Sequence, residues 1–144
     1  TWIIFLRLHP NVAFRSKEIK NPSFMIDVSD YEDGEELVAV SDVVITDYSS
    51  IMFEPAFVKK PVFLYAPDRY DYINQERELL IDYDTLPFEI AETNKELCER
   101  ILTFNRKKYE QRLDAFFQKY GVHEDGHAGE RAADFILKLL EKNE

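Results

Sequence analysis

The chain has 144 residues, the size of one ordinary domain, and its 18 Lys and Arg against 28 Asp and Glu give a formal net charge of −10. So acidic a chain repels a phosphate backbone, which excludes nucleic acid as a partner. Hydrophobic residues at 45% exclude global disorder, and the single cysteine excludes a disulfide framework or a multi-cysteine zinc site.

The first half of the chain alternates short apolar runs with helical patterns. Strands are expected over 2–8, 24–28, 43–46 and 62–65, with weaker strand patterns over 79–83 and 88–91. A short helix is expected over 35–40 with Asp33 as its N-cap, and a second helix over about 50–58. The run Val43–Thr46 is continuously apolar, which is typical of a strand buried on both faces of a parallel sheet.

The second half of the chain is helical from Thr93 onward. Thr93 and Glu96 form a capping-box pattern at the start of a helix in which Cys98 is interpreted as a core residue. The apolar side of this helix is formed by Leu97, Ile101 and Leu102. The next helix has an apolar stripe of Tyr109, Leu113, Phe116, Phe117 and Tyr120 and ends at Gly121. The last helix carries a stripe of Ala132, Ala133, Ile136, Leu137 and Leu140.

This alternation predicts an α/β fold, an open, doubly wound parallel sheet whose faces are covered by helices. Ligands of such sheets bind at the carboxyl ends of the strands. Three polar groups follow predicted strands: Arg7 with His9, the segment 47–50, and the segment 67–70. In a parallel sheet all three lie at one edge.

The turn over 46–50 leads from a buried strand directly into a helix. The free backbone N–H groups of a first helical turn and the positive end of the helix dipole favour an anion. Ser49 and Ser50 add hydroxyl donors, and Arg7 is suited to a bidentate contact with a phosphate. Glu54 lies one helical turn after Ser50 and is suited to accept hydrogen bonds from sugar or glycerol hydroxyls.

Each of these features also has a simpler structural interpretation. Two serines after a strand are often only an N-cap, and Arg7 and His9 then belong to a polar rim. His123 and His127 lie four residues apart, but the intervening Gly126 and the lack of a third ligand argue against a metal site. A basic cluster beside the second-half helices is interpreted as a solvated face, with contact to a membrane as the alternative; it comprises Arg100, Arg106, Lys107, Lys108 and Arg112.

Taken together, several motifs resemble one family. They are Arg7-Leu8-His9-Pro10, the string Ser-Asp-Val-Val-Ile-Thr-Asp-Tyr-Ser-Ser over 41–50 with Glu54, and Lys60-Pro61-Val62-Phe63. The pattern closely resembles the C-terminal domain of the CDP-glycerol glycerophosphotransferases, the teichoic acid primases and polymerases of Gram-positive cell walls. The resemblance extends to Asp68–Tyr72 with Arg77 and to Asp125-Gly126-His127 with Arg131, and it spans almost the whole chain.

The resemblance implies a Rossmann-like parallel sheet flanked by helices, the C-terminal half of a GT-B fold. Residues 1–144 are then a single, partial CDP-alditol-binding domain, and the missing initiator Met leads us to expect a longer protein. Members of the family transfer glycerol phosphate from CDP-glycerol, or ribitol phosphate from CDP-ribitol, to a lipid-linked acceptor and release CMP. They need no cofactor and attach peripherally to the cytoplasmic face of the plasma membrane. The acceptor is reached through the N-terminal domain, so we expect this chain alone to be inactive.

The resemblance also assigns site residues. Arg7, Leu8 and His9 match the Arg-x-His stretch at the donor phosphates, with His9 as a catalytic residue that stabilises the leaving phosphate. Ser49 and Ser50 match the serines that hold the diphosphate, and Glu54 replaces a family Asp that contacts the donor. Departures from the family pattern at Glu78 and over 86–88 leave open which acceptor or alditol the 71–88 loop accommodates.

Two other classes remain open at this stage. One is another GT-B enzyme, a nucleotide-sugar glycosyltransferase or epimerase with the same phosphate site. The other is a non-enzymatic, receiver-like α/β interaction domain, which fits the acidity of the chain and binds no nucleotide.

Overall fold

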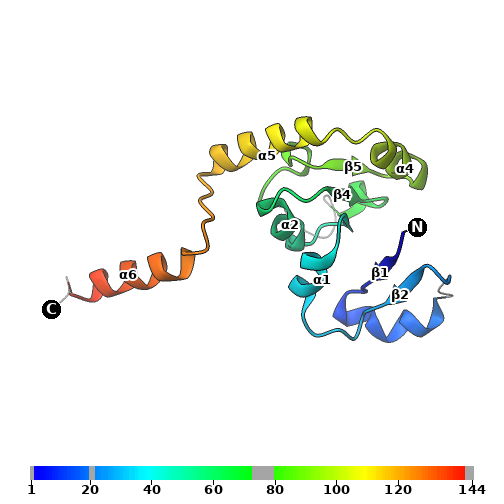
Figure 1. Ribbon diagram of the computed structural model, residues 1–144, viewed down its shortest axis with the longest axis horizontal. Helices are drawn as coiled ribbons and strands as arrows, with labels where there is room; N and C mark the ends of the chain where they lie inside the picture. The colour runs from blue at the N-terminus through cyan, green and yellow to red at the C-terminus, as the bar shows by residue number, and fades with distance from the viewer. Residues whose placement is uncertain (1, 20–21, 73–79, 142–144) are drawn as a thin grey trace. The chain divides into compact units, whose positions relative to one another are not determined.

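The computed structural model describes residues 2–19, 22–72 and 80–141, which fall into two compact units, Thr1–Val40 and Ser41–Glu144 (Figure 1). Each unit contains parallel strands joined through helical segments. The division into units does not test whether residues 1–144 act as a single domain, and that interpretation stays a prediction.

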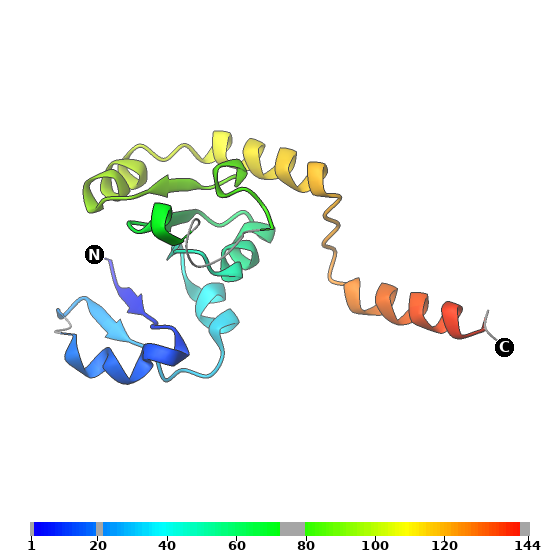
Figure 2. The ribbon, with the colours of Figure 1, turned by 180° about the vertical axis from the view of Figure 1, so that it is seen from behind.

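The first unit is built on two parallel strands, β1 (Ile4–Leu6) and β2 (Met25–Asp27), which pair in the register Ile4↔Met25. A 3₁₀ helix, η1 (Pro10–Glu18), connects them, and α1 (Gly34–Val40) follows β2 (Figure 2). Both strands lie inside the predicted runs and are shorter. η1 lies outside the predicted elements, although His9 caps it and Pro10 occupies its first position, where proline favours a helix start.

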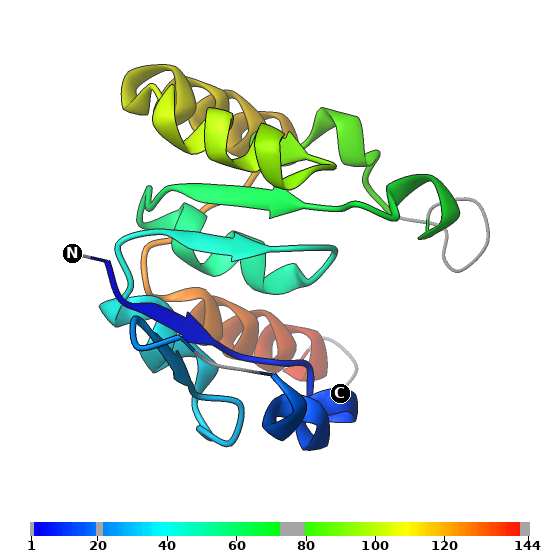
Figure 3. The same ribbon diagram turned by 90° about the vertical axis from the view of Figure 1, so that its right-hand side faces the viewer.

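The second unit contains a three-stranded parallel sheet in the order β3-β4-β5, formed by β3 (Val44–Thr46), β4 (Val62–Tyr65) and β5 (Glu89–Ala91) (Figure 3). Val44 pairs with Val62, and Phe63 pairs with Glu89. The predicted parallel α/β architecture is therefore confirmed.

The strands of this sheet differ in burial. The central strand β4 is buried on both faces, with Val62, Phe63 and Leu64 at most 1% exposed. β3 borders the sheet, and its Ile45 is 50% exposed. Burial on both faces was predicted for Val43–Thr46. Within the second unit it is found at β4 instead, and β3 does not show it at Ile45.

Helical segments connect and cover the strands of the second unit. They are η2 (Ser50–Met52), α2 (Phe53–Phe57), α3 (Arg69–Asp71), η4 (Tyr83–Thr85), α4 (Asn94–Leu102), α5 (Arg106–Tyr120) and α6 (Ala128–Glu141). The helix predicted over 50–58 is present but opens as a 3₁₀ turn. The strand predicted over 79–83 is wrong for 80–83, where Tyr83 begins η4; residue 79 lies outside the described part of the chain.

The core of the second unit forms around β4. Val62 and Leu64 cluster with Met52, Ala56, Tyr109 and Leu113, which come from η2, α2 and α5. Phe63 packs against Phe104, with 5.4 Å between the ring centroids. The predicted stripe of α5 is confirmed at Tyr109, Leu113 and Phe116, which are at most 7% exposed, whereas Tyr120 is 43% exposed. Burying such side chains contributes about 1.5–3 kcal/mol each, so packing against α2 and α5 stabilises β4.

The predicted helix ends are present. Thr93 and Glu96 form a reciprocal capping box, with 3.2 Å from the Glu96 amide to Thr93 Oγ1 and 3.3 Å from the Thr93 amide to Glu96 Oε2. Asp33 Oδ1 accepts from the amides of Glu35 and Glu36. Gly121 ends α5 in the left-handed conformation at φ 63°, which glycine adopts without strain.

Two predictions for the C-terminal helices need correction. Cys98 is exposed rather than part of the core, and Leu102 is 84% exposed. None of the residues of α6 is buried, and Ile136, Leu137 and Leu140 of its apolar stripe are 56, 57 and 61% exposed. In the described ranges no helix combines the length and apolar character that crossing a bilayer requires.

Candidate functional site

The turn that follows β3 satisfies three of its amides with its own atoms. Asp47 Oδ1 accepts from the Ser49 amide at 3.3 Å, and Ser49 Oγ accepts from the Ile51 amide at 3.4 Å. The Met52 amide donates to the Ser49 carbonyl at 3.2 Å. The prediction of free amides is therefore wrong for Ser49 and Ile51, because the side chains of Asp47 and Ser49 cap them.

The hydroxyls are the donors that this turn offers to a ligand. Ser49 and Ser50 are both exposed, and a hydroxyl that accepts one hydrogen bond can still donate its own hydrogen. Glu54 is exposed in the first turn of α2, four residues after Ser50. The structure thus keeps the predicted serine pair open to solvent at the carboxyl end of β3.

The carboxyl ends of β3 and β4 meet, as the parallel sheet predicts. The Tyr48 hydroxyl donates to Asp68 Oδ1 at 2.7 Å, which joins the turn after β3 to the turn after β4. The Tyr48 ring stacks on Tyr72, with 3.7 Å between centroids and 4° between the planes. Two of the three polar groups expected at this edge are therefore in direct contact.

Sequence reasoning missed one member of this edge. Tyr83, expected at the end of a strand, is 2% exposed and donates from its hydroxyl to the Asp47 carbonyl at 3.1 Å. The Arg69 guanidinium lies over its ring, 5.6 Å from the centroid, and forms ion pairs with Asp84 and Glu92. No local pattern marks Tyr83, because its partner lies 36 positions earlier in the chain.

Burial perturbs both tyrosine hydroxyls. Desolvation, reinforced by the hydrogen bond to the Asp68 carboxylate, raises the pKa of Tyr48. Desolvation is the largest cause of the raised pKa of Tyr83, and the negative charge of the nearby Asp47 carboxylate raises this pKa further. Both groups therefore remain protonated donors across the physiological range.

Arg7, Leu8 and His9 belong to the first unit, where each has a local structural contact. Arg7 Nη2 donates to the carbonyls of Tyr31 and Glu32 at 3.2 and 3.4 Å. The Leu8 amide donates to Ser29 Oγ at 3.1 Å. His9 Nδ1 accepts from the Asn11 amide at 3.2 Å as the cap of η1, so its Nε2 carries the proton in the neutral ring. Their predicted roles at the donor phosphates stay predictions.

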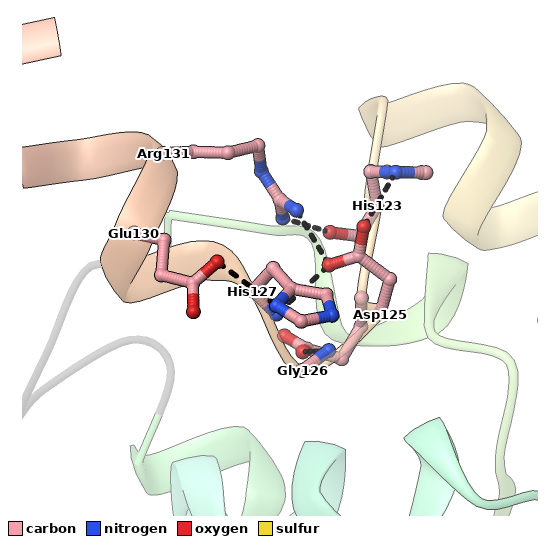
Figure 4. A network of polar contacts seen from close by, with 7 residues as sticks. His123, Asp125, Gly126, His127, Glu130 and Arg131 are labelled. Atoms are coloured by element: carbon pink, nitrogen blue, oxygen red, sulfur yellow. Dashed lines mark hydrogen bonds and ion pairs between the residues drawn. The ribbon is translucent and has the colours of Figure 1, made fainter. Parts of the chain in front are cut away.

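A polar cluster connects α5 to α6 (Figure 4). Arg131 donates to Asp125 Oδ1 and to the His123 carbonyl, and the His127 amide also donates to Asp125 Oδ1. The hydrogen bond from Arg131, then that from the His127 amide, lowers the pKa of Asp125 to about 2. The Asp-Gly-His and Arg elements of the sequence motif are thus a structural clasp at the start of α6.

The other charged candidates are largely paired. His123 faces Asp125 and His127 faces Glu130, and across the described ranges no three metal-ligating side chains gather. In the basic cluster, Arg100 and Arg112 both pair with Glu89, and Arg106 pairs with Glu110. This pairing favours the interpretation of a solvated face.

Comparison with known proteins gives the context of these motifs. Residues 1–138 match the family "CDP-Glycerol:Poly(glycerophosphate) glycerophosphotransferase". The chain belongs to this family. Among curated members, it is 34% identical over 140 residues to the teichoic acid ribitol-phosphate primase of Bacillus spizizenii, covering 96% of this chain and 35% of that protein. It is 36% identical over 140 residues to the teichoic acid glycerol-phosphate transferase of Staphylococcus aureus, covering 95% and 36%.

Comparison with solved structures supports the same family. A variant of the wall teichoic acid polymerase TagF, soaked with CDPG for 30 minutes, superposes with a TM-score of 0.74 at 30% identity over 98% of this chain and 36% of that chain. The predicted fold class, a Rossmann-like half of a GT-B fold, is confirmed by this likeness and by the parallel sheets. The chain spans about a third of the length of these family members.

Proposed function

We propose that this chain is the donor-binding part of a transferase that moves glycerol phosphate from CDP-glycerol to a teichoic acid or related lipid-linked acceptor, with release of CMP. The observation that carries this proposal is the exposed Ser49–Ser50 pair at the carboxyl end of β3, in a chain that matches the family over residues 1–138. Ligands of parallel α/β sheets bind at that end. A TagF variant soaked with CDPG supports the choice of donor.

In the proposed reaction, an acceptor hydroxyl attacks the β-phosphorus of CDP-glycerol, a P–O bond forms, and the bond to CMP breaks. The charge that develops on the leaving phosphate is stabilised by donors fixed in advance. Ser49 and Ser50 supply hydroxyls, Arg7 a guanidinium and His9 its Nε2–H. Glu54 accepts from the glycerol hydroxyls, and the base for the acceptor comes from the rest of the enzyme.

CDP-ribitol is the second candidate donor. One specific observation favours it, because the Bacillus spizizenii relative with 34% identity is a ribitol-phosphate primase. CDP-glycerol and CDP-ribitol have the same CDP diphosphate and differ only in the alditol, so the serine turn is suited equally to either donor. The choice of alditol therefore depends on residues that contact the alditol itself rather than on the serine turn.

The test is CMP release by the full-length protein that carries this chain, supplied with CDP-glycerol, CDP-ribitol or a UDP-sugar. We expect turnover with a CDP-alditol only. Changing Ser49 and Ser50 together to Ala removes two hydrogen bonds to a charged group, about 1.5–3 kcal/mol each, and should raise the donor KM at least about a hundredfold. Turnover of a UDP-sugar, or a double variant with an unchanged KM, would refute the proposal.

We further propose that the full-length protein attaches peripherally to the cytoplasmic face of the plasma membrane, where lipid-linked acceptors are available. The pairing of Arg100, Arg106 and Arg112 with carboxylates argues that the chain described here does not supply the attachment. Release of the protein from washed membranes by high salt, without detergent, is the expected result. If high salt does not release the protein and only detergent does, peripheral attachment is contradicted.

A further inference from the structure

Two tyrosines, the buried Tyr83 and the half-buried Tyr48, hold the turn after β3. Tyr83 reaches it from η4, and Tyr48, within the turn, is anchored to the turn after β4. We infer that Tyr83 is a positioning residue, which fixes the Asp47–Ser50 turn in the shape that binds the donor diphosphate. This inference rests on the proposed function and adds a residue that touches neither the donor nor the acceptor.

The first contact acts on the backbone of the turn itself. The Tyr83 hydroxyl donates to the carbonyl of Asp47, two residues before the first of the exposed serines. Because Tyr83 is 2% exposed, water cannot easily replace this bond. Without this hydrogen bond the Asp47 carbonyl is free to move. The Asp47 side chain accepts from the Ser49 amide, so the movement extends to the serine pair.

Arg69 holds the Tyr83 ring in place. Its guanidinium lies over the ring and is bound by Asp84 in η4 and by Glu92 after β5. Two carboxylates already compensate the charge of Arg69, and its side chain is 22% exposed. Arg69 therefore ties the Tyr83 ring to η4 and to the segment that follows β5.

Tyr48 supplies the second anchor. Its hydroxyl donates to Asp68 at 2.7 Å and its ring stacks on Tyr72. Two successive residues, Asp47 and Tyr48, are thus fixed by different partners directly before the serine pair. A site that is rigid before its ligand arrives loses less conformational entropy on binding, so these contacts favour donor affinity.

The experiment compares two chemically identical changes in the full-length protein. Tyr83→Phe removes the hydroxyl that holds the Asp47 carbonyl. Tyr109→Phe is the matched control, because Tyr109 is also buried, at 0% exposure, and its hydroxyl donates to a backbone carbonyl, that of Lys60, at 2.7 Å. Lys60 precedes β4, so this control bond lies at the opposite end of the strands.

We expect both variants to melt at similarly lowered temperatures. Tyr83→Phe alone should raise the KM for the CDP-alditol about three- to tenfold, with kcat nearly unchanged, which corresponds to one typical hydrogen bond. A KM within twofold of the wild type, or an equal rise in Tyr109→Phe, would overturn the inference. Should Tyr83→Phe fail to fold, Tyr48→Phe decides by the same KM criterion. A wild-type protein that turns over no CDP-alditol would refute the proposed function instead.

Discussion

Replacing Leu113 by Ala tests whether α5 fixes the central strand. Leu113 is 0% exposed and clusters with Val62 and Leu64 of β4 and with Ala56 of α2. Removing its three outer carbon groups loses about 2.4 kcal/mol of transfer free energy, at about 0.8 kcal/mol for each. The cavity that remains adds to this loss, so we expect the free energy of unfolding to fall by about 3 kcal/mol.

The measurement is urea denaturation of the 144-residue chain, read as a lower midpoint at an unchanged m-value. Leu102→Ala is the matched control, because it is the same change on α4 at a side chain that is 84% exposed. The control should shift the free energy of unfolding by no more than about 0.5 kcal/mol. Equal losses in the two variants, or a loss below about 1 kcal/mol for Leu113→Ala, would show that α5 does not pack on β4 as described.

Two further predictions concern local contacts. Thr93→Ala removes one half of the capping box and should lower the free energy of unfolding by about 1 kcal/mol, and a variant as stable as the parent chain would argue against the reciprocal bonds. Asp125, whose pKa Arg131 and the His127 amide lower to about 2 from 3.8, stabilises the clasp above pH 3.8, and this contribution is lost as the pH falls through about 2. NMR titration of the Asp125 carboxyl should show this midpoint, and Arg131→Gln should move it upward; a midpoint near 3.8 in the parent chain would rule the clasp out.

Much of the fold was predictable because its signals are local. The apolar run at β4, the capping box at Thr93 and the glycine after α5 each lie within a few residues of what they determine. The parallel arrangement followed from the alternation of strands and helices. Burial was less predictable, because β3 and β4 carry the same continuous apolar pattern. β4 is central in the sheet and buried, whereas β3 lies at the end of the strand order and its Ile45 is half exposed.

The candidate site was predictable in its location but not in its chemistry. The rule for parallel sheets placed Ser49 and Ser50 at the carboxyl end of β3, where they are exposed. The amides were expected to be free, and the side chains of Asp47 and Ser49 use them instead. Tyr83 was misassigned because its importance depends on a hydrogen bond across 36 positions, which no periodicity records.

Arg7 has a structural role in the first unit, and this role leaves room for the binding role that we propose for it. Its two recorded bonds, to the carbonyls of Tyr31 and Glu32, are both made by Nη2. A guanidinium has five N–H donors on three nitrogens, so Arg7 is able to hold this loop and still contact a phosphate oxygen. A Cβ at position 34 would clash with Arg7 Nη1, so Gly34 allows the guanidinium to approach the backbone. The local contacts of Arg7 therefore leave N–H donors for the proposed role at the diphosphate.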